Sequence, residues 1–249
     1  MALLPALIGH RGSAATAPEN TLSGIRAAYE AGAGAVEVDV KLTRDGVAVL
    51  MHDDTLARTT NGVGRMVDAD WATVKGLDAG YASRFGTRFA DEPVPRLDAV
   101  LTCVIELGMA INLEIKPCPG RERETALATV EAVRRLWPAD RPWPVLSSFQ
   151  RDCLVTVREV APDLPRGYLV EALGPDWLAE ATALGVATVH PGRKHLSDDQ
   201  ARSVVASGLP LIVWTVNDDS EAKHLLGLGA AGIITDDPAS LMPLFVKGI

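Results

Sequence analysis

The most constraining feature of this sequence is a regular alternation of short apolar runs with segments of helical periodicity. Apolar runs rich in β-branched residues predict strands at residues 7–10, 35–42, 48–52, 111–116, 144–149, 166–171, 187–191, 210–216 and 232–236. Helical periodicity predicts helices at residues 19–31, 97–107, 121–137, 151–160, 175–184, 197–207, 219–228 and 238–245. Because strands that alternate with helices pair in parallel, we expect a parallel sheet with its helices outside.

The number of strands selects a barrel. The dipeptide Asp45-Gly46 is a turn signal, so residues 48–52 are expected to return along residues 35–42 as a hairpin, which leaves eight main strands. Eight strand–helix units in 249 residues are typical of a TIM (β/α)8 barrel. The competing fold is a doubly wound sheet, but no glycine-rich phosphate loop follows the first strand. We therefore predict that residues 1–249 form a single TIM-barrel domain.

The alternation is interrupted after the second strand, between residues 53 and about 95. This stretch contains NGVG, DAGYASRFG and DEPVP, which are typical of turns and loops. We predict a small insertion there, with at most one short helix. Loops of this length in compact domains are usually functional or disordered.

Charged side chains alternate with apolar ones on two of the predicted strands. Residues 35–42 read AVEVDVKL, with Glu37, Asp39 and Lys41 between apolar residues, and residues 111–116 read INLEIK, with Glu114 and Lys116. Since strand side chains alternate between faces, the apolar set can face the helices while the charged set points into the barrel. A carboxylate buried in this way needs a partner or a cation.

The three carboxylates predict a metal site. Glu37, Asp39 and Glu114 offer oxygen ligands from two strands, the kind that Mg²⁺ or Ca²⁺ prefers. Without a cluster of cysteine and histidine ligands, zinc is disfavoured. The alternative is a structural role, either on a sheet with one solvated face or in an interior salt bridge such as Glu37–Lys41.

Two histidines end predicted strands in charged surroundings. His10 stands in GHRG and His52 in MHDD, and the carboxyl ends of barrel strands form the active-site mouth. Histidine titrates near neutrality, so a pair suits general acid and base catalysis. His190 also ends a strand, but without a partner signal we expect it to be structural. His195 and His224 fall in helical stretches and are expected to be solvated.

Charge and composition narrow the partners and the compartment. The chain has 24 Lys+Arg against 32 Asp+Glu, a net charge of −8, which disfavours nucleic acid. Three cysteines without a CxxC motif suggest a reducing compartment. The opening MALLPALIGH lacks the basic region of a signal peptide, and no apolar run approaches the roughly 20 residues that cross a bilayer. We expect a cytoplasmic protein without stable membrane insertion, and predict no particular oligomeric state.

The ordered motifs HRG, APENT, EVDV, HDDTLARTTNG, LEIKP, WTVN and GIITDDP extend from His10 to Pro238. In this order they resemble the glycerophosphodiester phosphodiesterase family. The resemblance implies a TIM barrel with a small insertion after the second strand. It also implies site roles: acid/base catalysis by His10 and His52, divalent-cation ligation by Glu37, Asp39 and Glu114, phosphate binding by Arg11 and Lys116, a pocket wall at Trp214, a position near the site for Glu19, and a supporting role for Asp236.

The implied reaction is hydrolysis of a small glycerophosphodiester, such as glycerophosphocholine or glycerophosphoethanolamine, to sn-glycerol 3-phosphate and an alcohol. The family suggests a cyclic glycerol phosphate intermediate. Our own hypothesis is that His52 is the acid and His10 the base of the first step. One alternative is a lysophospholipase D-like phosphodiesterase, whose apolar entrance Tyr81, Phe85 and Phe89 would provide. Another is a non-catalytic barrel that binds phosphorylated ligands. Glu171, at a strand end, is expected to be exposed rather than to contact substrate.

Overall fold

Eight parallel strands form the centre of the protein. The computed structural model describes residues 3–246 and gives the strand order β7-β6-β5-β4-β2-β1-β9-β8. Isolated parallel bridges, Val189 to Leu211 and Gly192 to Trp214, join the two outer strands of this order. The predicted TIM barrel is therefore confirmed. Its strands are β1 (Leu7–His10), β2 (Ala35–Leu42), β4 (Ala110–Ile115), β5 (Val145–Ser148), β6 (Arg166–Val170), β7 (Thr188–Pro191), β8 (Ile212–Val213) and β9 (Gly232–Thr235).

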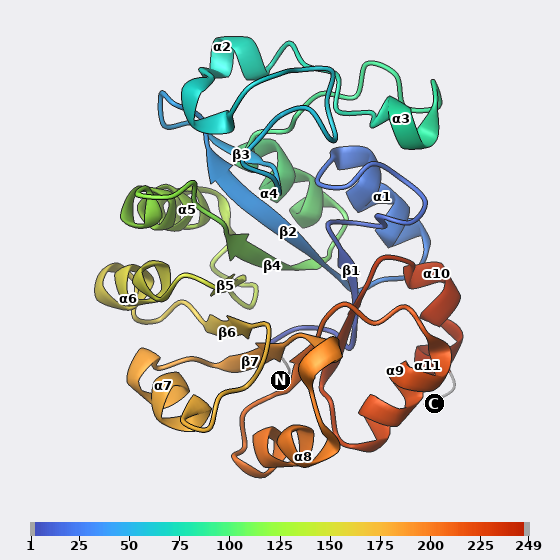
Figure 1. Ribbon diagram of the computed structural model, residues 1–249, viewed down its shortest axis with the longest axis vertical. Helices are drawn as coiled ribbons and strands as arrows, with labels where there is room; N and C mark the ends of the chain where they lie inside the picture. The colour runs from blue at the N-terminus through green and yellow to red at the C-terminus, as the bar shows by residue number, and fades with distance from the viewer. Residues whose placement is uncertain (1–2, 247–249) are drawn as a thin grey trace.

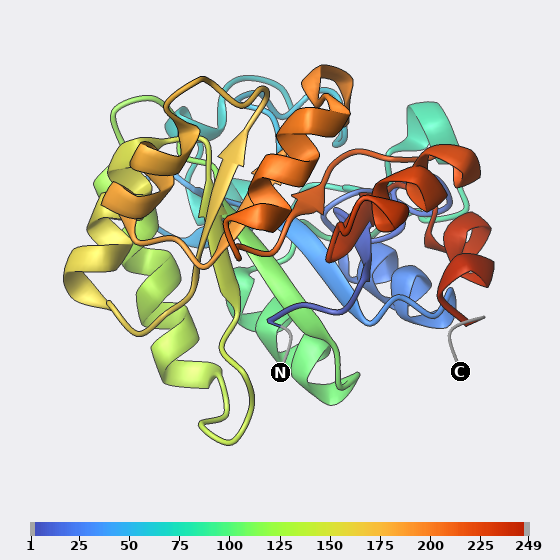
Figure 2. The same cartoon turned by 90° about the horizontal axis from the view of Figure 1, so that it is seen from below.

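Helices form a ring around these strands, as Figure 1 shows. Figure 2 shows the same arrangement from the side, with helices packed against the outside of the strands. Those that follow the barrel strands are α1 (Leu22–Glu30), α4 (Leu97–Glu106), α5 (Glu122–Leu136), α6 (Arg151–Val160), α7 (Trp177–Leu184), α8 (Asp198–Ala206), α9 (Asp219–Gly227), α10 (Pro238–Leu241) and α11 (Pro243–Val246). Within residues 3–246, no helix has the length and apolar character needed to span a membrane.

The hairpin prediction is confirmed, whereas the prediction that the insertion holds at most one short helix was wrong. Strand β3 (Ala48–Leu50) pairs antiparallel with β2 and stands outside the eight-strand order. Between β3 and α4, the chain forms three short helical segments instead of at most one: η1 (Met66–Asp68), α2 (Trp71–Val74) and α3 (Ala82–Phe85). Met66 and Val74 are buried in a separate small core with Val49 of β3. This local core stabilises turns that are too short to show helical periodicity.

Two predicted helices have different boundaries for identifiable reasons. Helix α1 begins at Leu22 rather than at residue 19, because the Thr21 side chain accepts a hydrogen bond from the Gly24 amide as an N-cap. Glu19 is thus left in the preceding loop, free to reach the site. The predicted helix 238–245 is divided into α10 and α11 at Pro243, where proline has no amide hydrogen to continue the helix.

Strand side chains alternate as the sequence pattern predicts. Val36, Val38 and Val40 are fully buried in the main core, which includes side chains of the surrounding helices. Glu37 and Asp39 therefore lie on the opposite face of β2, inside the barrel. A third apolar cluster contains Leu4, Ile8, Ala35, Val145, Ile212 and Ile234. Apart from Leu4, which precedes β1, these residues share the inward register of β1, β2, β5, β8 and β9 and fill the barrel interior, leaving its polar groups at the other end.

Candidate active site

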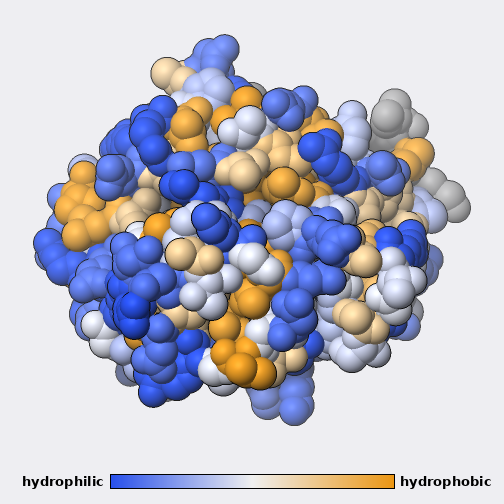
Figure 3. Space-filling model, turned by 90° about the horizontal axis from the view of Figure 1, so that it is seen from above, coloured by the Kyte–Doolittle hydropathy of each residue, from blue (hydrophilic) through white to orange (hydrophobic). Residues whose placement is uncertain are grey.

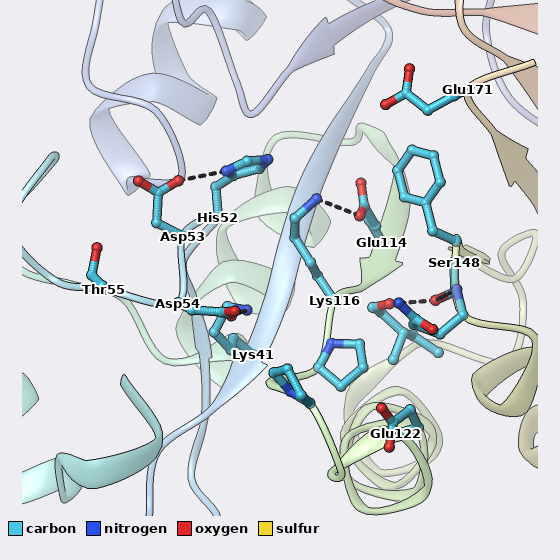
Figure 4. A pocket seen from close by; sticks show the side chains of 15 residues that line it. Lys41, His52, Asp53, Asp54, Thr55, Glu114, Lys116, Glu122, Ser148 and Glu171 are labelled. Carbon is cyan, nitrogen blue, oxygen red and sulfur yellow. Dashed lines mark hydrogen bonds and ion pairs between the residues drawn. The ribbon is translucent and has the colours of Figure 1, made fainter. Parts of the chain in front are cut away.

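Two adjoining cavities open where the barrel strands end. The inner cavity is about 90 Å³ and is lined by His10, Arg11, Glu37, His52, Asn112, Glu114, Lys116, Phe149, Leu169, Glu171, Trp214 and Ile234. The outer cavity is about 650 Å³ and includes the first residues of the insertion (Figure 4). Residues at the carboxyl ends of strands form a large part of the lining, as expected for a TIM-barrel site. All eight predicted site residues except Asp39 line the inner cavity, and Asp39 is buried beside it.

The three predicted metal-ligating carboxylates converge. Asp39 of β2 is register partner to Glu114 of β4, and Glu37 lies two residues earlier on β2. One ligand atom from each residue lies within 4.8 Å of the other two, and all three residues are buried. The Oε1 atom of Glu37 is buried without a hydrogen-bond partner in the described chain. An all-oxygen donor set with one unsatisfied ligand atom fits a hard divalent cation.

Two cations partly compensate this negative charge. Arg11 Nε lies 3.3 Å from Asp39 Oδ2, and Lys116 Nζ lies 2.8 Å from Glu114 Oε1 and 3.5 Å from Asp39 Oδ1. Burial raises the pKa of Glu37 well above its ordinary value, with repulsion from Asp39 and Glu114 adding to the effect. Burial and repulsion from Asp39 raise the pKa of Glu114 to about 7. Burial acts in the same direction on Asp39, but Arg11 and Lys116 hold its pKa below the ordinary value.

The loop after β1 delivers Arg11 through an unusual backbone. Arg11 and Asn20 both adopt left-handed conformations, with φ of 53° and 57°, which non-glycine residues seldom adopt outside functional or constrained positions. The Arg11 amide donates a hydrogen bond to Glu37 at 3.2 Å, and the Asn20 side chain donates to Asp39 at 2.7 Å. Gly12 has φ of 91°, and a Cβ there would lie 2.4 Å from the backbone of Gly24. The loop thus folds tightly enough to orient both carboxylates.

The Nδ1 atom of His10 has a carboxylate partner. Its Nδ1 lies 2.6 Å from Asp236 Oδ1, and Asn217 donates to the other oxygen of Asp236 at 2.7 Å. Burial raises the pKa of Asp236, but the His10 hydrogen bond and charge outweigh it and lower the pKa below its ordinary value. A proton held on Nδ1 leaves Nε2 as the free acceptor. His10 Nε2 lies 4.0 Å from Glu37 Oε2, beside the carboxylate cluster.

His52 is held by a chain of alternating charges. Its Nδ1 lies 2.7 Å from Asp53 Oδ1, and Arg58 donates to both oxygens of Asp53 and both oxygens of Glu19. Glu19 also accepts a hydrogen bond from Arg11 at 2.8 Å. Burial and the positive charge of Arg11 lower the pKa of His52 below its ordinary value, despite the opposing effect of its carboxylate neighbours.

Lys41 has different surroundings from those expected, whereas the surroundings of His190 agree with the prediction. Lys41 is buried and pairs with Asp54 at 2.8 Å, so the alternative Glu37–Lys41 salt bridge was wrong. Asp54 belongs to the insertion, which the strand pattern alone could not position. His190 is fully buried, its Nε2 lies 2.8 Å from the Thr188 hydroxyl oxygen, and burial lowers its pKa to about 3. The prediction of a structural His190 is consistent with this environment.

Other polar residues at the site were not given roles by the sequence. Asn20, Asp53, Arg58 and Asn217 hold the predicted site residues in place. Each of these residues occurs in a motif noted above, APENT, HDDTLARTTNG or WTVN, which was the available signal. Phe149 had no such signal, and it lines both cavities.

The family model for the glycerophosphoryl diester phosphodiesterase family matches residues 10–240. The chain belongs to this family. A glycerophosphodiester phosphodiesterase of Caldanaerobacter subterraneus subsp. tengcongensis is 34% identical over 97% of this chain and 98% of its own length. One of Bacillus subtilis is 31% identical over 93% of this chain and 83% of its own length.

A solved phosphodiesterase structure also matches the fold closely. This Oleispira antarctica phosphodiesterase, in complex with the product sn-glycerol-3-phosphate, superposes with a TM-score of 0.93. It is 36% identical to this chain, and the match covers 98% of each chain. The sequence-based family resemblance is therefore confirmed, and the protein is an enzyme of the glycerophosphoryl diester phosphodiesterase family.

Proposed function

We propose that this protein hydrolyses small glycerophosphodiesters to sn-glycerol 3-phosphate and an alcohol, with His10 and His52 as its acid/base pair. The observation that carries the proposal is that both histidines line one small cavity with Glu37 and Glu114. Each histidine has a carboxylate on Nδ1, which directs the other ring nitrogen to accept or donate a proton in the reaction. The B. subtilis relative, a glycerophosphodiester phosphodiesterase, and the O. antarctica phosphodiesterase with bound sn-glycerol-3-phosphate support the proposal.

His10 is the general base of the first step. Its Nε2 takes the proton of the glycerol 2-hydroxyl, whose oxygen attacks phosphorus and forms a cyclic phosphate. Asp236 keeps the ring tautomer correct and stabilises the positive charge that develops on His10. The roles reverse in the second step, when His10 returns the proton to the 2-oxygen as water opens the ring.

His52 is the general acid of the first step. It protonates the oxygen of the departing alcohol, and in the second step it removes a proton from the attacking water. The lowered pKa of His52 makes the protonated ring a better proton donor. His52 also lines the outer cavity, which His10 does not, so His52 is the histidine beside the exit for the alcohol.

Arg11 and Lys116 bind the phosphate oxygens. Both reach the cavity lining from the carboxylate side, and both carry a pKa raised by neighbouring carboxylates against the effect of burial. They remain charged throughout the neutral pH range and offset the repulsion between the phosphate and the acidic cluster. A net charge of −8 is thus compatible with an anionic substrate, because charge at the cavity is set locally.

The cation that we propose is Mg²⁺ or Ca²⁺, held by Glu37, Asp39 and Glu114. When bound, a divalent cation neutralises phosphate charge and acidifies a hydroxyl that it contacts. Asn20 and the Arg11 amide hold two of the three carboxylates in place for it.

The lysophospholipase D-like alternative has weaker support. Phe85 packs edge-on against Tyr81 and Phe89, with ring centroids 6.1 and 5.5 Å apart, and arginine side chains lie over all three rings. None of the three rings lines either active-site cavity. On the side that carries α2 and α3, Figure 3 shows hydrophobic residues in separate patches among hydrophilic ones. A small, water-soluble diester therefore suits the entrance better than an acyl chain.

A product assay tests the proposed function. Wild-type protein with Mg²⁺ or Ca²⁺ should release sn-glycerol 3-phosphate from glycerophosphocholine faster than from lysophosphatidylcholine, and EDTA should abolish this activity. His10→Ala and His52→Ala should each lose at least ~10²-fold in kcat, while His195→Ala, at an exposed position, should retain full activity. Near-normal turnover by either active-site variant would contradict the acid/base assignment. A preference for lysophosphatidylcholine would favour the alternative.

A further inference from the structure

Glu171 is a charged cavity residue that the proposed mechanism leaves unused. It directly follows β6, lines both cavities, and is exposed. In the described part of the chain, no hydrogen bond or ion pair of its carboxylate is found. Figure 4 shows Glu171 on the opposite side of the cavity from His52 and Asp53. A carboxylate in this position has its full hydrogen-bonding capacity available to a ligand.

Phe149 gives the same region an aromatic wall. Phe149 directly follows β5. Its side chain lines both cavities and is 37% exposed. It packs edge-on against Trp214, with ring centroids 5.5 Å apart, and Lys116 Nζ lies 5.5 Å from its centroid. Aromatic faces attract alkylammonium groups. Lys116 itself pairs with Glu114 at 2.8 Å and not with Glu171, so the carboxylate of Glu171 remains available to a ligand cation.

In the proposed mechanism, the inner cavity accommodates the glycerol phosphate half of the diester and the outer cavity accommodates the alcohol. His10 and Glu37 line only the inner cavity, whereas His52 lines both. Since His52 protonates the departing oxygen in the proposed mechanism, the remainder of the alcohol extends from His52 toward the outer cavity. Glu171 and Phe149 line both cavities, so they lie along this path.

The outer cavity carries one further carboxylate without a cationic partner in the described part of the chain. Its lining adds Asp53, Asp54 and Glu122. Asp53 pairs with Arg58 and Asp54 pairs with Lys41, so Glu122 is left to add to the negative charge of Glu171. Its volume of about 650 Å³ is within the range of small-molecule sites. A neutral or anionic alcohol gains nothing from this charge, whereas an ammonium group does.

We propose that Glu171 and Phe149 form a subsite for an alkylammonium leaving alcohol. The inference rests on the proposed function, because it extends that reaction to a preferred class of leaving group. Glu171 contributes charge and Phe149 contributes a cation–π contact, so the two together select glycerophosphodiesters of amino alcohols over those of neutral alcohols.

A substrate comparison tests this specificity. In wild-type protein, kcat/KM should be higher for glycerophosphocholine than for glycerophosphoglycerol. Glu171→Gln should lower kcat/KM for glycerophosphocholine by roughly 5- to 10-fold and change that for glycerophosphoglycerol less than about twofold. Glu131→Gln, at an exposed position on α5, is the matched control and should change neither. An equal loss on both substrates, or no loss on either, would overturn the subsite.

A binding measurement separates this inference from the proposed reaction. Saturation-transfer NMR with choline chloride should detect binding to wild-type protein and to Glu131→Gln, and a clearly weaker signal with Glu171→Gln and Phe149→Leu. Equal signals from all four proteins would refute the subsite even if turnover is observed. Absence of turnover with every glycerophosphodiester would refute the proposed function, and the choline signal would then decide the subsite by itself.

Discussion

Replacing Glu37 with glutamine should stabilise the cation-free protein and abolish its stabilisation by divalent cations. Glutamine keeps the length of the side chain and can still accept the hydrogen bond that the Arg11 amide donates at 3.2 Å. It removes a buried carboxylate whose ionisation is opposed by burial and by repulsion from Asp39 and Glu114, with ligand atoms of the three residues within 4.8 Å of one another. The same charge that destabilises the cation-free site is needed to hold the cation, so the two effects of the substitution have opposite signs.

The magnitude follows from the geometry of the cluster. At 4.8 Å, the largest separation within the cluster, and an effective dielectric constant of about 20, each pair of ionised carboxylates repels by about 3.5 kcal/mol. Attraction between Arg11 and Glu37 offsets part of this repulsion. We therefore expect the Glu37→Gln variant to gain roughly 1–3 kcal/mol in free energy of unfolding without cation. For a chain of this length, that gain corresponds to a rise in Tm of roughly 2–12 °C.

The effect of the cation on the wild type is comparable in size. At a cation concentration 100 times its Kd, the gain is about 2.7 kcal/mol, or roughly 5–10 °C in Tm. The pKa of Glu114 is raised from 4.5 to about 7, so the folded state binds more protons than the unfolded state between these values. Stability of the cation-free protein should fall as pH rises through this window. Stabilisation by the cation should grow over the same window, because fewer protons compete with it.

Differential scanning calorimetry of EDTA-treated protein at pH 5.5 and pH 8, with and without MgCl₂ or CaCl₂, measures both effects. Wild type and the exposed-site control Glu131→Gln should show the cation shift at pH 8 and a smaller one at pH 5.5. Glu37→Gln should shift by less than about 2 °C. If Glu37→Gln melts below the wild type in EDTA, or keeps the full cation shift, the electrostatic reasoning is wrong.

Three further substitutions test other features of the site and fold. Asp236→Asn should lower kcat by about 10²-fold in steady-state kinetics, with KM changed less than about threefold. The reason is that the asparagine amide can donate a hydrogen bond to His10 Nδ1 and move the ring proton to Nε2. An unchanged kcat would contradict this role of Asp236. Gly12→Ala should lower the free energy of unfolding, measured with urea, by at least ~2 kcal/mol because the new Cβ clashes with the backbone. Gly46→Ala, also at positive φ but with open space around it, should lower it less. Equal losses in the two variants would exclude the clash. The pKa of His190 is lowered from 6.5 to about 3, so protonation of this histidine favours the unfolded state below pH 6.5. Between pH 7 and pH 5, the free energy of unfolding should therefore fall by about 2 kcal/mol less in His190→Gln than in the wild type. An unchanged pH dependence of stability would refute this.

Much of the site was predictable because strand periodicity assigns each side chain to a face. The alternation around Glu37 and Asp39 places both carboxylates inside the barrel, and β2 has the burial pattern expected from it. The position of His10 at the end of β1 likewise placed it at the mouth of the barrel. The insertion was harder to predict, since its short helices depend on a small core shared with β3.

The sequence by itself determined the succession of strands and helices, the hairpin at β3, and the residue types available for chemistry. Periodicity gives the face of a side chain but not its neighbour, and only closure of the barrel decided which ends met. Closure of the barrel placed β1 beside β9, so that His10 contacts Asp236, which lies 226 positions later in the chain. It also set the register that puts Asp39 opposite Glu114. The position of Glu171 at the junction of two cavities arises in the same way, because a cavity is formed by several strands together.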